Sequence, residues 1–186
     1  MSLTTTFINL TLFIHRIVTG FSTIPTAVQW IQGSFLLLSY GLIAVPFGIW
    51  RGFLQLDFHL SKSIIAKIAA TSLIAPAILE ELFFRVILLP HPSENLDFKQ
   101  ISIWSTVSLF VFIVYHPLNG ITFFPAGKKT FCDPVFLILA AFLGLCCTVA
   151  YLFSGSVWIS IIIHWFAVVI WLLCLGGISK LKLLND

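Results

Sequence analysis

Five long apolar runs constrain the fold of this chain more than any other feature of its sequence. An α-helix rises about 1.5 Å per residue, so roughly 20 residues cross the hydrocarbon core of a bilayer, which is about 30 Å thick. The runs are Trp30–Trp50, Ile64–Leu89, Ile101–His116, Pro134–Phe153 and Val157–Ile178. We therefore predict an all-α fold, a polytopic transmembrane helix bundle of about five spans.

The composition excludes an ordinary soluble domain. Only 9% of the residues are charged and 59% are hydrophobic, whereas about 25% of the residues in a soluble domain are charged. With 186 residues, the chain has room for one integral membrane domain, residues 1–186. The early stretch Phe7–Ile24 is interrupted by His15 and Arg16. We expect it to form an interfacial helix, with a sixth span as the alternative.

The basic residues indicate membrane topology rather than nucleic-acid binding, because they are scattered between the apolar runs despite a net charge of +3. With five spans, the segments Arg51–Ser63, Asn119–Asp133 and Ser179–Asp186 share one side of the membrane. The basic residues on that side are Arg51, Lys62, Lys128, Lys129, Lys180 and Lys182. Cytoplasmic loops carry an excess of Lys and Arg, so we predict that this side, and the C-terminus with it, is cytoplasmic.

Two adjacent acids, Glu80 and Glu81, lie inside the second apolar run. A charged side chain at the centre of a bilayer costs at least about 2.5–3.5 kcal/mol, so the pair marks a candidate functional site. On a helix, Glu81 and Arg85 are one turn apart and can pair, whereas Glu80 points about 100° away. Pro76 should kink the helix just before the acids. The alternative is a buried ion network that only fixes helix packing.

Two histidines, His116 and His164, also lie within apolar runs. Counted at 1.5 Å per residue from the predicted non-cytoplasmic ends of the spans, Glu80 lies about 15 Å deep, His164 about 12 Å and His116 about 18 Å. These depths are similar enough for the three polar groups, from three different helices, to meet. We therefore expect one interior site that contains a carboxylate and two imidazoles.

Such a set of side chains suits hydrolysis. Glu80 can take a proton from water, while one histidine holds the water and the other donates to the developing oxyanion. A glutamate and two histidines are also a reasonable set of zinc ligands, although no His-Glu-x-x-His pattern is present. Nucleophilic catalysis by Ser160, one turn from His164, is less favoured, because no Gly-x-Ser-x-Gly pattern surrounds it.

Three sequence patterns carry a resemblance to a known family. They are Glu80-Glu81-x-x-x-Arg85, Phe112-x-x-x-His116, and His164 in a last span that follows Ser154-Gly155-Ser156-Val157-Trp158. In this order they resemble the signature motifs of the CAAX-protease and bacteriocin-processing (CPBP, or Abi) family of intramembrane proteases. The resemblance covers residues 73–171, and His-Pro-Leu-Asn at residues 116–119 is similar to small cyanobacterial members.

The resemblance implies an intramembrane endopeptidase whose substrate is a peptide or membrane protein at the lipid bilayer. Glu80 would activate water with His116, and His164 would help to form the oxyanion hole. The supporting residues would be Glu81, Arg85 and Phe112. The better-studied relatives are similar to glutamate-dependent proteases, so we expect no metal or other cofactor, with zinc as the alternative.

One position departs from the family pattern. The third motif has Asn or Asp four residues after its histidine, and here that residue is Val168. Loss of an oxyanion-hole donor typically costs about 100- to 1000-fold in rate. Ser160 or a backbone group is a candidate substitute. The alternative function is therefore that of a catalytically weak or inactive relative, which acts as a membrane binding, immunity or scaffold protein.

Overall fold

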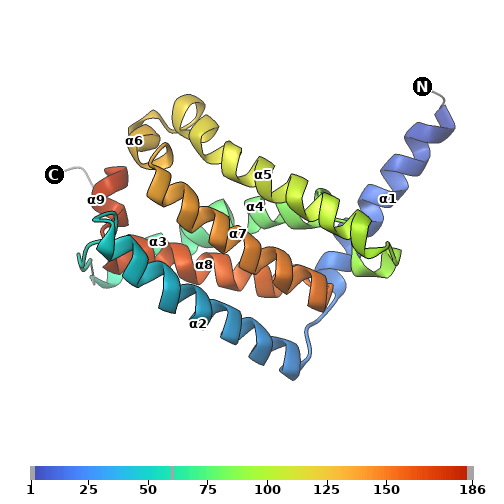
Figure 1. Ribbon diagram of the computed structural model, residues 1–186, viewed down its shortest axis with the longest axis horizontal. Helices are drawn as coiled ribbons and strands as arrows, with labels where there is room; N and C mark the ends of the chain where they lie inside the picture. Colours follow the sequence, from blue (N-terminus) through green and yellow to red (C-terminus); the bar gives the residue numbers. More distant parts are fainter. Residues whose placement is uncertain (1–2, 60, 184–186) are drawn as a thin grey trace.

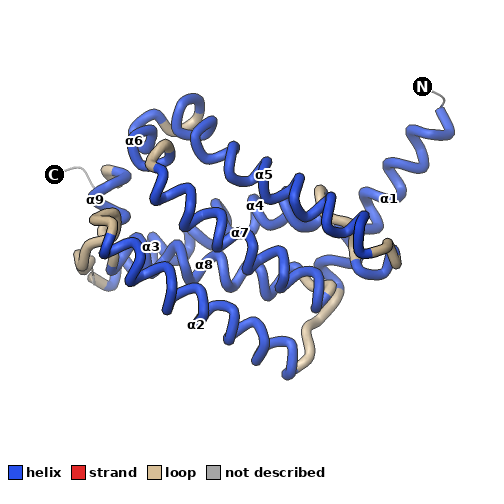
Figure 2. Tube along the Cα trace, in the orientation of Figure 1, coloured by secondary structure: helices blue, strands red, loops and turns tan. Residues whose placement is uncertain are grey.

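The computed structural model describes residues 3–59 and 61–183 of the chain. Helices make up most of this part, and no β-strand is found in it (Figure 1 and Figure 2). The predicted all-α fold is confirmed.

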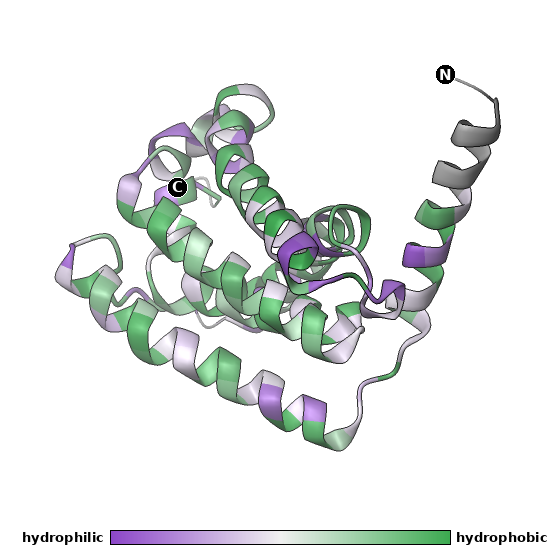
Figure 3. Cartoon of the chain, turned by 45° about the vertical axis from the view of Figure 1, so that its right-hand side comes forward, coloured by the Kyte–Doolittle hydropathy of each residue, from purple (hydrophilic) through white to green (hydrophobic). Residues whose placement is uncertain are grey.

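Four helices in the described chain are long and apolar enough to cross a membrane. They are α2 (Ala27–Trp50), α5 (Phe98–Thr122), α7 (Pro134–Ser154) and α8 (Val157–Cys174). Their outer faces expose large apolar side chains, such as Leu42 on α2 and Phe110 on α5. Figure 3 shows hydrophobic residues along much of the length of these helices. Exposed apolar surface of this extent fits a lipid surrounding, as expected for an integral membrane protein.

The apolar run Ile64–Leu89, which we predicted to be one span with a kink, is a helix broken into four segments. It consists of α3 (Lys62–Ser72), η1 (Leu73–Ile78), α4 (Leu79–Glu81) and η2 (Leu82–Ile87), of which η1 and η2 have the wider turns of a π-helix. Ala75 has an extended backbone, with φ −133° and ψ 117°. Proline disfavours the helical conformation in the residue before it, so the predicted kink at Pro76 is confirmed.

Two other predicted boundaries are wrong. We ended the third span at His116, but α5 continues to Thr122 with Pro117 inside it. Membrane helices tolerate proline because neighbouring groups satisfy the backbone that it frees. We ended the fifth span at Ile178, but α8 ends at Cys174, and α9 (Gly177–Leu181) follows a turn at Gly176, where φ is +83°.

The remaining helices are short or lie at the N-terminus. They are α1 (Leu3–Ser22), η3 (Pro92–Glu94), η4 (Pro125–Gly127) and α6 (Lys128–Phe131). The predicted N-terminal helix is thus present, and α1 extends away from the bundle at the end opposite to α9 (Figure 1). Its interfacial position stays a prediction.

The polar residues between the apolar runs determine where the long helices begin. Thr26, Asp97 and Asp133 each accept a hydrogen bond from a backbone N–H in the first turn of the helix that follows. Such caps contribute about 1 kcal/mol each to helix stability. The hairpin between α7 and α8 turns at Gly155, whose φ of +67° favours glycine, and Ser156 caps α8.

The hairpin of α7 and α8 packs between α2 on one side and α5 on the other (Figure 1). Close approach of α5 to α7 depends on Gly144, where an added Cβ would lie 2.9 Å from the side chains of both Leu109 and Phe112. At one end of the bundle, where α2, α5 and α8 finish, lie the basic residues Arg51, Lys62, Lys128, Lys129 and Lys180. We call this the basic end.

Candidate active site

The two adjacent acids face different surroundings. They lie on α4, a short helical turn between the wider turns of η1 and η2. Glu81 is fully buried, whereas Glu80 lines a cavity. Neighbouring residues on a helix point about 100° apart, as we predicted for this pair. The carboxylate of Glu81 therefore lies in the protein interior, and that of Glu80 faces the cavity.

Glu81 is the centre of a buried polar network. Its Oε2 atom lies 3.1 Å from Nε of Arg85, which confirms the predicted pair. Its Oε1 atom lies 2.7 Å from Nδ1 of His164. Arg85 also donates from Nη2 to the carbonyl of Gly144 at 3.0 Å, and its guanidinium lies over the ring of Phe112 at 4.9 Å. The network therefore joins four helical segments, η2, α5, α7 and α8, around one carboxylate.

The bond to Glu81 determines which nitrogen of His164 carries a proton. A carboxylate only accepts hydrogen bonds, so we infer that Nδ1 of His164 is the donor. The other nitrogen, Nε2, lies 3.9 Å from Oε2 of Glu80. His164 is thus held between the two acids, with its second nitrogen directed to the side of Glu80.

The ring of His116 is oriented by its own helix. Its Nδ1 atom lies 2.8 Å from the carbonyl oxygen of Phe112, which can only accept, so Nδ1 carries the proton. The ring also contacts the aromatic side chains of Phe112 and Phe136, with centroids 4.7 Å and 5.3 Å away. A neutral imidazole that donates from Nδ1 has a lone pair at Nε2, which can accept a proton or a hydrogen bond.

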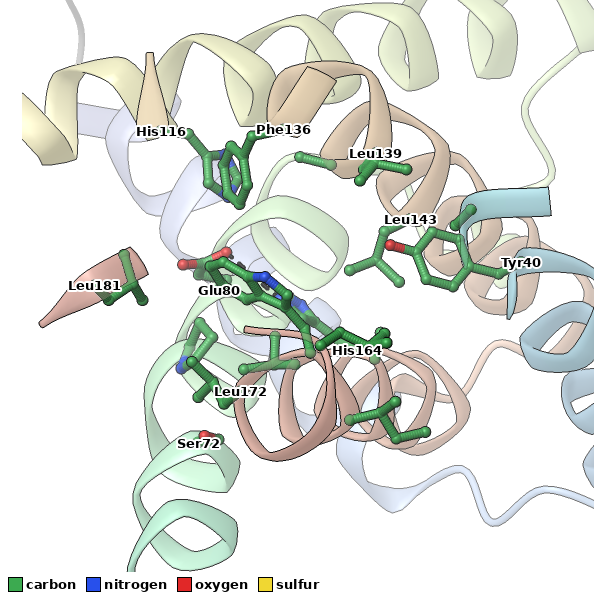
Figure 4. A pocket seen from close by; sticks show the side chains of 18 of the residues that line it. Tyr40, Ser72, Glu80, His116, Phe136, Leu139, Leu143, His164, Leu172 and Leu181 are labelled. Atoms are coloured by element: carbon green, nitrogen blue, oxygen red, sulfur yellow. Dashed lines mark ion pairs between the residues drawn. The ribbon is translucent and has the colours of Figure 1, made fainter. Parts of the chain in front are cut away.

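The side chains of Glu80, His116 and His164 all line one cavity of about 760 Å³ (Figure 4). They come from α4, α5 and α8 respectively. Apolar side chains of α2, α7 and α8 make up most of the remaining wall, among them Leu139, Leu143 and Leu172. The structure therefore brings three titratable side chains to one mostly apolar cavity of a membrane bundle, which is a typical setting for chemistry.

The other predicted site residues lie around this cavity in different ways. Phe112 is part of the wall, whereas Glu81 and Arg85 lie behind Glu80 and His164. Ser160 is fully buried, and its hydroxyl donates to the carbonyl of Cys147 at 2.8 Å, which ties α8 to α7. Its hydroxyl is thus already engaged. Val168 is in the cavity wall.

Among the described residues, no group of three or more His, Cys, Asp or Glu side chains is arranged to hold a metal ion. Glu80 and His164 approach each other, and the Nδ1 atom of His116 is turned to its own helix.

Several residues that position the site have no signal in the sequence patterns. Ser108 on α5 donates to the carbonyl of Phe84 at 2.6 Å and so holds η2 against α5. His91, which a loop position would leave in solvent, is buried, with Nε2 2.9 Å from the carbonyl oxygen of Gly155. Asn119 lines the cavity beyond His116. These contacts are long-range or depend on the extension of α5, and residue spacing alone does not reveal them.

A comparison with known families finds a match. The model of the type II CAAX prenyl endopeptidase Rce1-like family matches residues 62–170. This segment begins at α3 and ends within α8, so it contains all three cavity-lining groups. Neither a curated protein nor a solved structure was found to match the chain.

Proposed function

The chain belongs to the type II CAAX prenyl endopeptidase Rce1-like family, and we propose that it is an intramembrane endopeptidase in which Glu80 activates water to hydrolyse a peptide bond. The matched segment, residues 62–170, is more than half of the chain. The observation that carries most weight is that Glu80, His116 and His164 face one cavity from three different helices. A family of proteases and a cavity with proton-transfer groups support the same type of chemistry.

Water activation is the role that we assign to Glu80 and His116. A water molecule between the carboxylate and Nε2 of His116 gives a proton to Glu80 while its oxygen attacks the peptide carbonyl carbon. The tetrahedral intermediate then collapses, the C–N bond breaks, and the proton passes from Glu80 to the leaving amine. One water is consumed, one carboxyl group and one amine are formed, and Glu80 is again a carboxylate.

Stabilisation of the oxyanion is the role that we assign to His164. Its Nδ1–H is engaged by Glu81, so it can donate to the substrate only if Nε2 is also protonated. In that state the two carboxylates, Glu80 and Glu81, are balanced by the imidazolium and by Arg85. The four groups then have no net charge, which lowers the cost of burying them in an apolar surrounding.

A peptidase assay in detergent tests this function. The purified protein is incubated with a mixed peptide panel, which includes prenylated CAAX-type peptides because the family description names them. The arms are wild type and Glu80→Gln, each with and without a chelator. We expect cleavage by the wild type that survives chelation and is lost in Glu80→Gln. Loss on chelation with rescue by zinc would contradict the metal-free mechanism.

A second candidate function is that of a weak or inactive relative that binds a membrane protein or peptide. The observation that favours it is Val168, an apolar residue in the cavity wall, at the position where the resemblance leads us to expect Asn or Asp. The test compares Val168→Asn with the wild type on the same panel. Cleavage by neither protein would favour the binding function. A large gain in Val168→Asn would instead identify an impaired enzyme.

A further inference from the structure

The inference concerns the polar group that the cavity lacks at Val168, and it rests on the proposed function. Val168 lies one helical turn after His164 on α8, on the side toward the basic end, and is part of the cavity wall. A valine side chain cannot donate a hydrogen bond. If the cavity is an active site, a second donor beside His164 must come from another element.

A polar side chain from α5, that of Asn119, lines the same cavity as Val168. Helices α5 and α8 run in the same direction, because α7 returns the chain between them (Figure 1). Asn119 follows His116 by three residues, as Val168 follows His164 by four, so both lie about one turn closer to the basic end than a site histidine. Phe112, His116 and Asn119 all line the cavity, and they share one face of α5.

The carboxamide of Asn119 is free to bind a substrate. Its side chain makes no hydrogen bond to any described residue, while its backbone carbonyl accepts from the N–H groups of Phe123 and Phe124. Among the described residues that line the cavity, it is the only Asn or Gln. Side chains on a helix lean toward the N-terminus of that helix. The Asn119 amide therefore leans from the basic end back toward His116.

We propose that the Asn119 carboxamide donates a hydrogen bond to the carbonyl oxygen of the bound peptide on which negative charge develops. It would supply, from α5, the second donor that Val168 does not supply from α8. An amide has two N–H donors and stays neutral, so it stabilises an oxyanion without adding a charge to the balanced set around Glu81. The extension of α5 beyond Pro117 brings this residue into the cavity wall.

Four variants test the proposal in the peptidase assay, on the substrate that the wild type cleaves fastest. Asn119→Leu keeps the size of the side chain and removes the donor. We expect its kcat to fall about 100- to 1000-fold with little change in KM. In the double variant Asn119→Leu with Val168→Asn, an amide returns to the same region, and we expect at least a tenfold recovery of kcat. Val168→Asn alone is measured as the reference for the double variant.

Thr122→Val is the matched control. Thr122 is on α5 near Asn119 but exposed, and its hydroxyl donates to the carbonyl of Leu118. We expect wild-type kcat from this variant. Melting temperatures of all variants in detergent must match that of the wild type, so that a loss of rate reports on chemistry rather than on folding.

The outcomes separate this inference from the proposed function. If the wild type cleaves, Glu80→Gln does not, and Asn119→Leu keeps its kcat, then the inference is wrong and the function stands. A loss of rate in Asn119→Leu that Val168→Asn does not restore, or a change confined to KM, also overturns the assignment as an oxyanion donor. If the wild type cleaves no peptide of the panel, the proposed function fails, and the inference fails with it.

Discussion

At the scale of single residues, Arg85 is the position whose buried charge most requires a partner. Its side chain is 1% exposed, and the carboxylate of Glu81, which is fully buried, lies 3.1 Å away. A buried ion pair adds little net stability, but removal of one partner leaves a buried charge without compensation. The pair is therefore a condition for folding rather than a source of stability.

We therefore predict that substitutions of the two residues are not additive in their effect on the free energy of unfolding. Arg85→Met and Glu81→Gln should each destabilise the fold by about 3–5 kcal/mol. Arg85→Met leaves the buried carboxylate of Glu81 with His164 alone, and Glu81→Gln leaves the buried guanidinium without a carboxylate. The double variant should lose less than the sum of the two single losses. The measurement is the free energy of unfolding of all four proteins in detergent. Strict additivity would show that the two side chains do not interact.

The residue scale also shows what local spacing can predict. The pair of Glu81 with Arg85 could be predicted, because residues four apart on a helix lie on one face. The bond from His164 to Glu81 joins residues 83 positions apart. Depth counting placed Glu80 and His164 at similar levels, but it could not show which of the two acids the imidazole bonds. That choice depends on how α8 packs against α4.

At the scale of elements, an ion pair helps to fasten the N-terminal helix to the bundle, beside the hydrogen bond that Nε1 of Trp158 donates to the carbonyl of Phe21. Arg16 on α1 donates from Nε and Nη2 to the two carboxylate oxygens of Glu94, at 2.7 Å and 2.8 Å, and from Nη1 to the carbonyl of Ile87. The backbone N–H of His91 also donates to Glu94. Partial burial raises the pKa of Glu94, but the hydrogen bonds from Arg16 and His91 outweigh it and hold that pKa below its usual value.

This lowered pKa predicts how stability depends on pH. A carboxylate whose pKa is lower in the folded state stabilises the fold above its unfolded pKa, about 4.3 for Glu. That contribution is lost as the pH falls through the folded pKa. The wild type should therefore melt at a higher temperature than Glu94→Gln at pH 7, and the difference should shrink below about pH 4. A difference that does not change with pH would contradict this role.

Element boundaries were predictable from the sequence only in part. The caps at Thr26, Asp97 and Asp133 are local, and they lie close to the predicted starts of the runs. The break at Ala75 follows from Pro76, but the wider turns on both sides of α4 depend on packing against other helices. The continuation of α5 through Pro117 likewise depends on its neighbours, so a proline that ends a helix in water did not end one here.

At the scale of the whole molecule, the arrangement of charges indicates how the bundle lies in the membrane. The ends of α2, α5 and α8 share the basic end with α6 and α9 (Figure 1). Positive charge is enriched on the cytoplasmic side of membrane proteins. We propose that the basic end, and the C-terminus with it, is cytoplasmic.

Thiol labelling checks this orientation. Cys132 is exposed at the basic end, whereas Cys146 and Cys147 are buried. In sealed cells, a membrane-impermeant maleimide should leave Cys132 unlabelled until the membrane is permeabilised. As a matched control, Lys99→Cys in a Cys132→Ser background places a thiol on an exposed residue at the opposite end. It should react without permeabilisation, and the reverse pattern would invert the proposed topology.

The most direct measurement is the single-turnover rate of peptide cleavage by the wild type, by Glu80→Gln and by Glu94→Gln. The last variant makes the same chemical change at a glutamate outside the cavity, and its rate should equal that of the wild type at pH 7. Removal of a general base typically costs about 100- to 10,000-fold, so we predict a loss of at least about 100-fold in Glu80→Gln. Cleavage by Glu80→Gln at the wild-type rate would contradict the assignment of Glu80 as the residue that activates water.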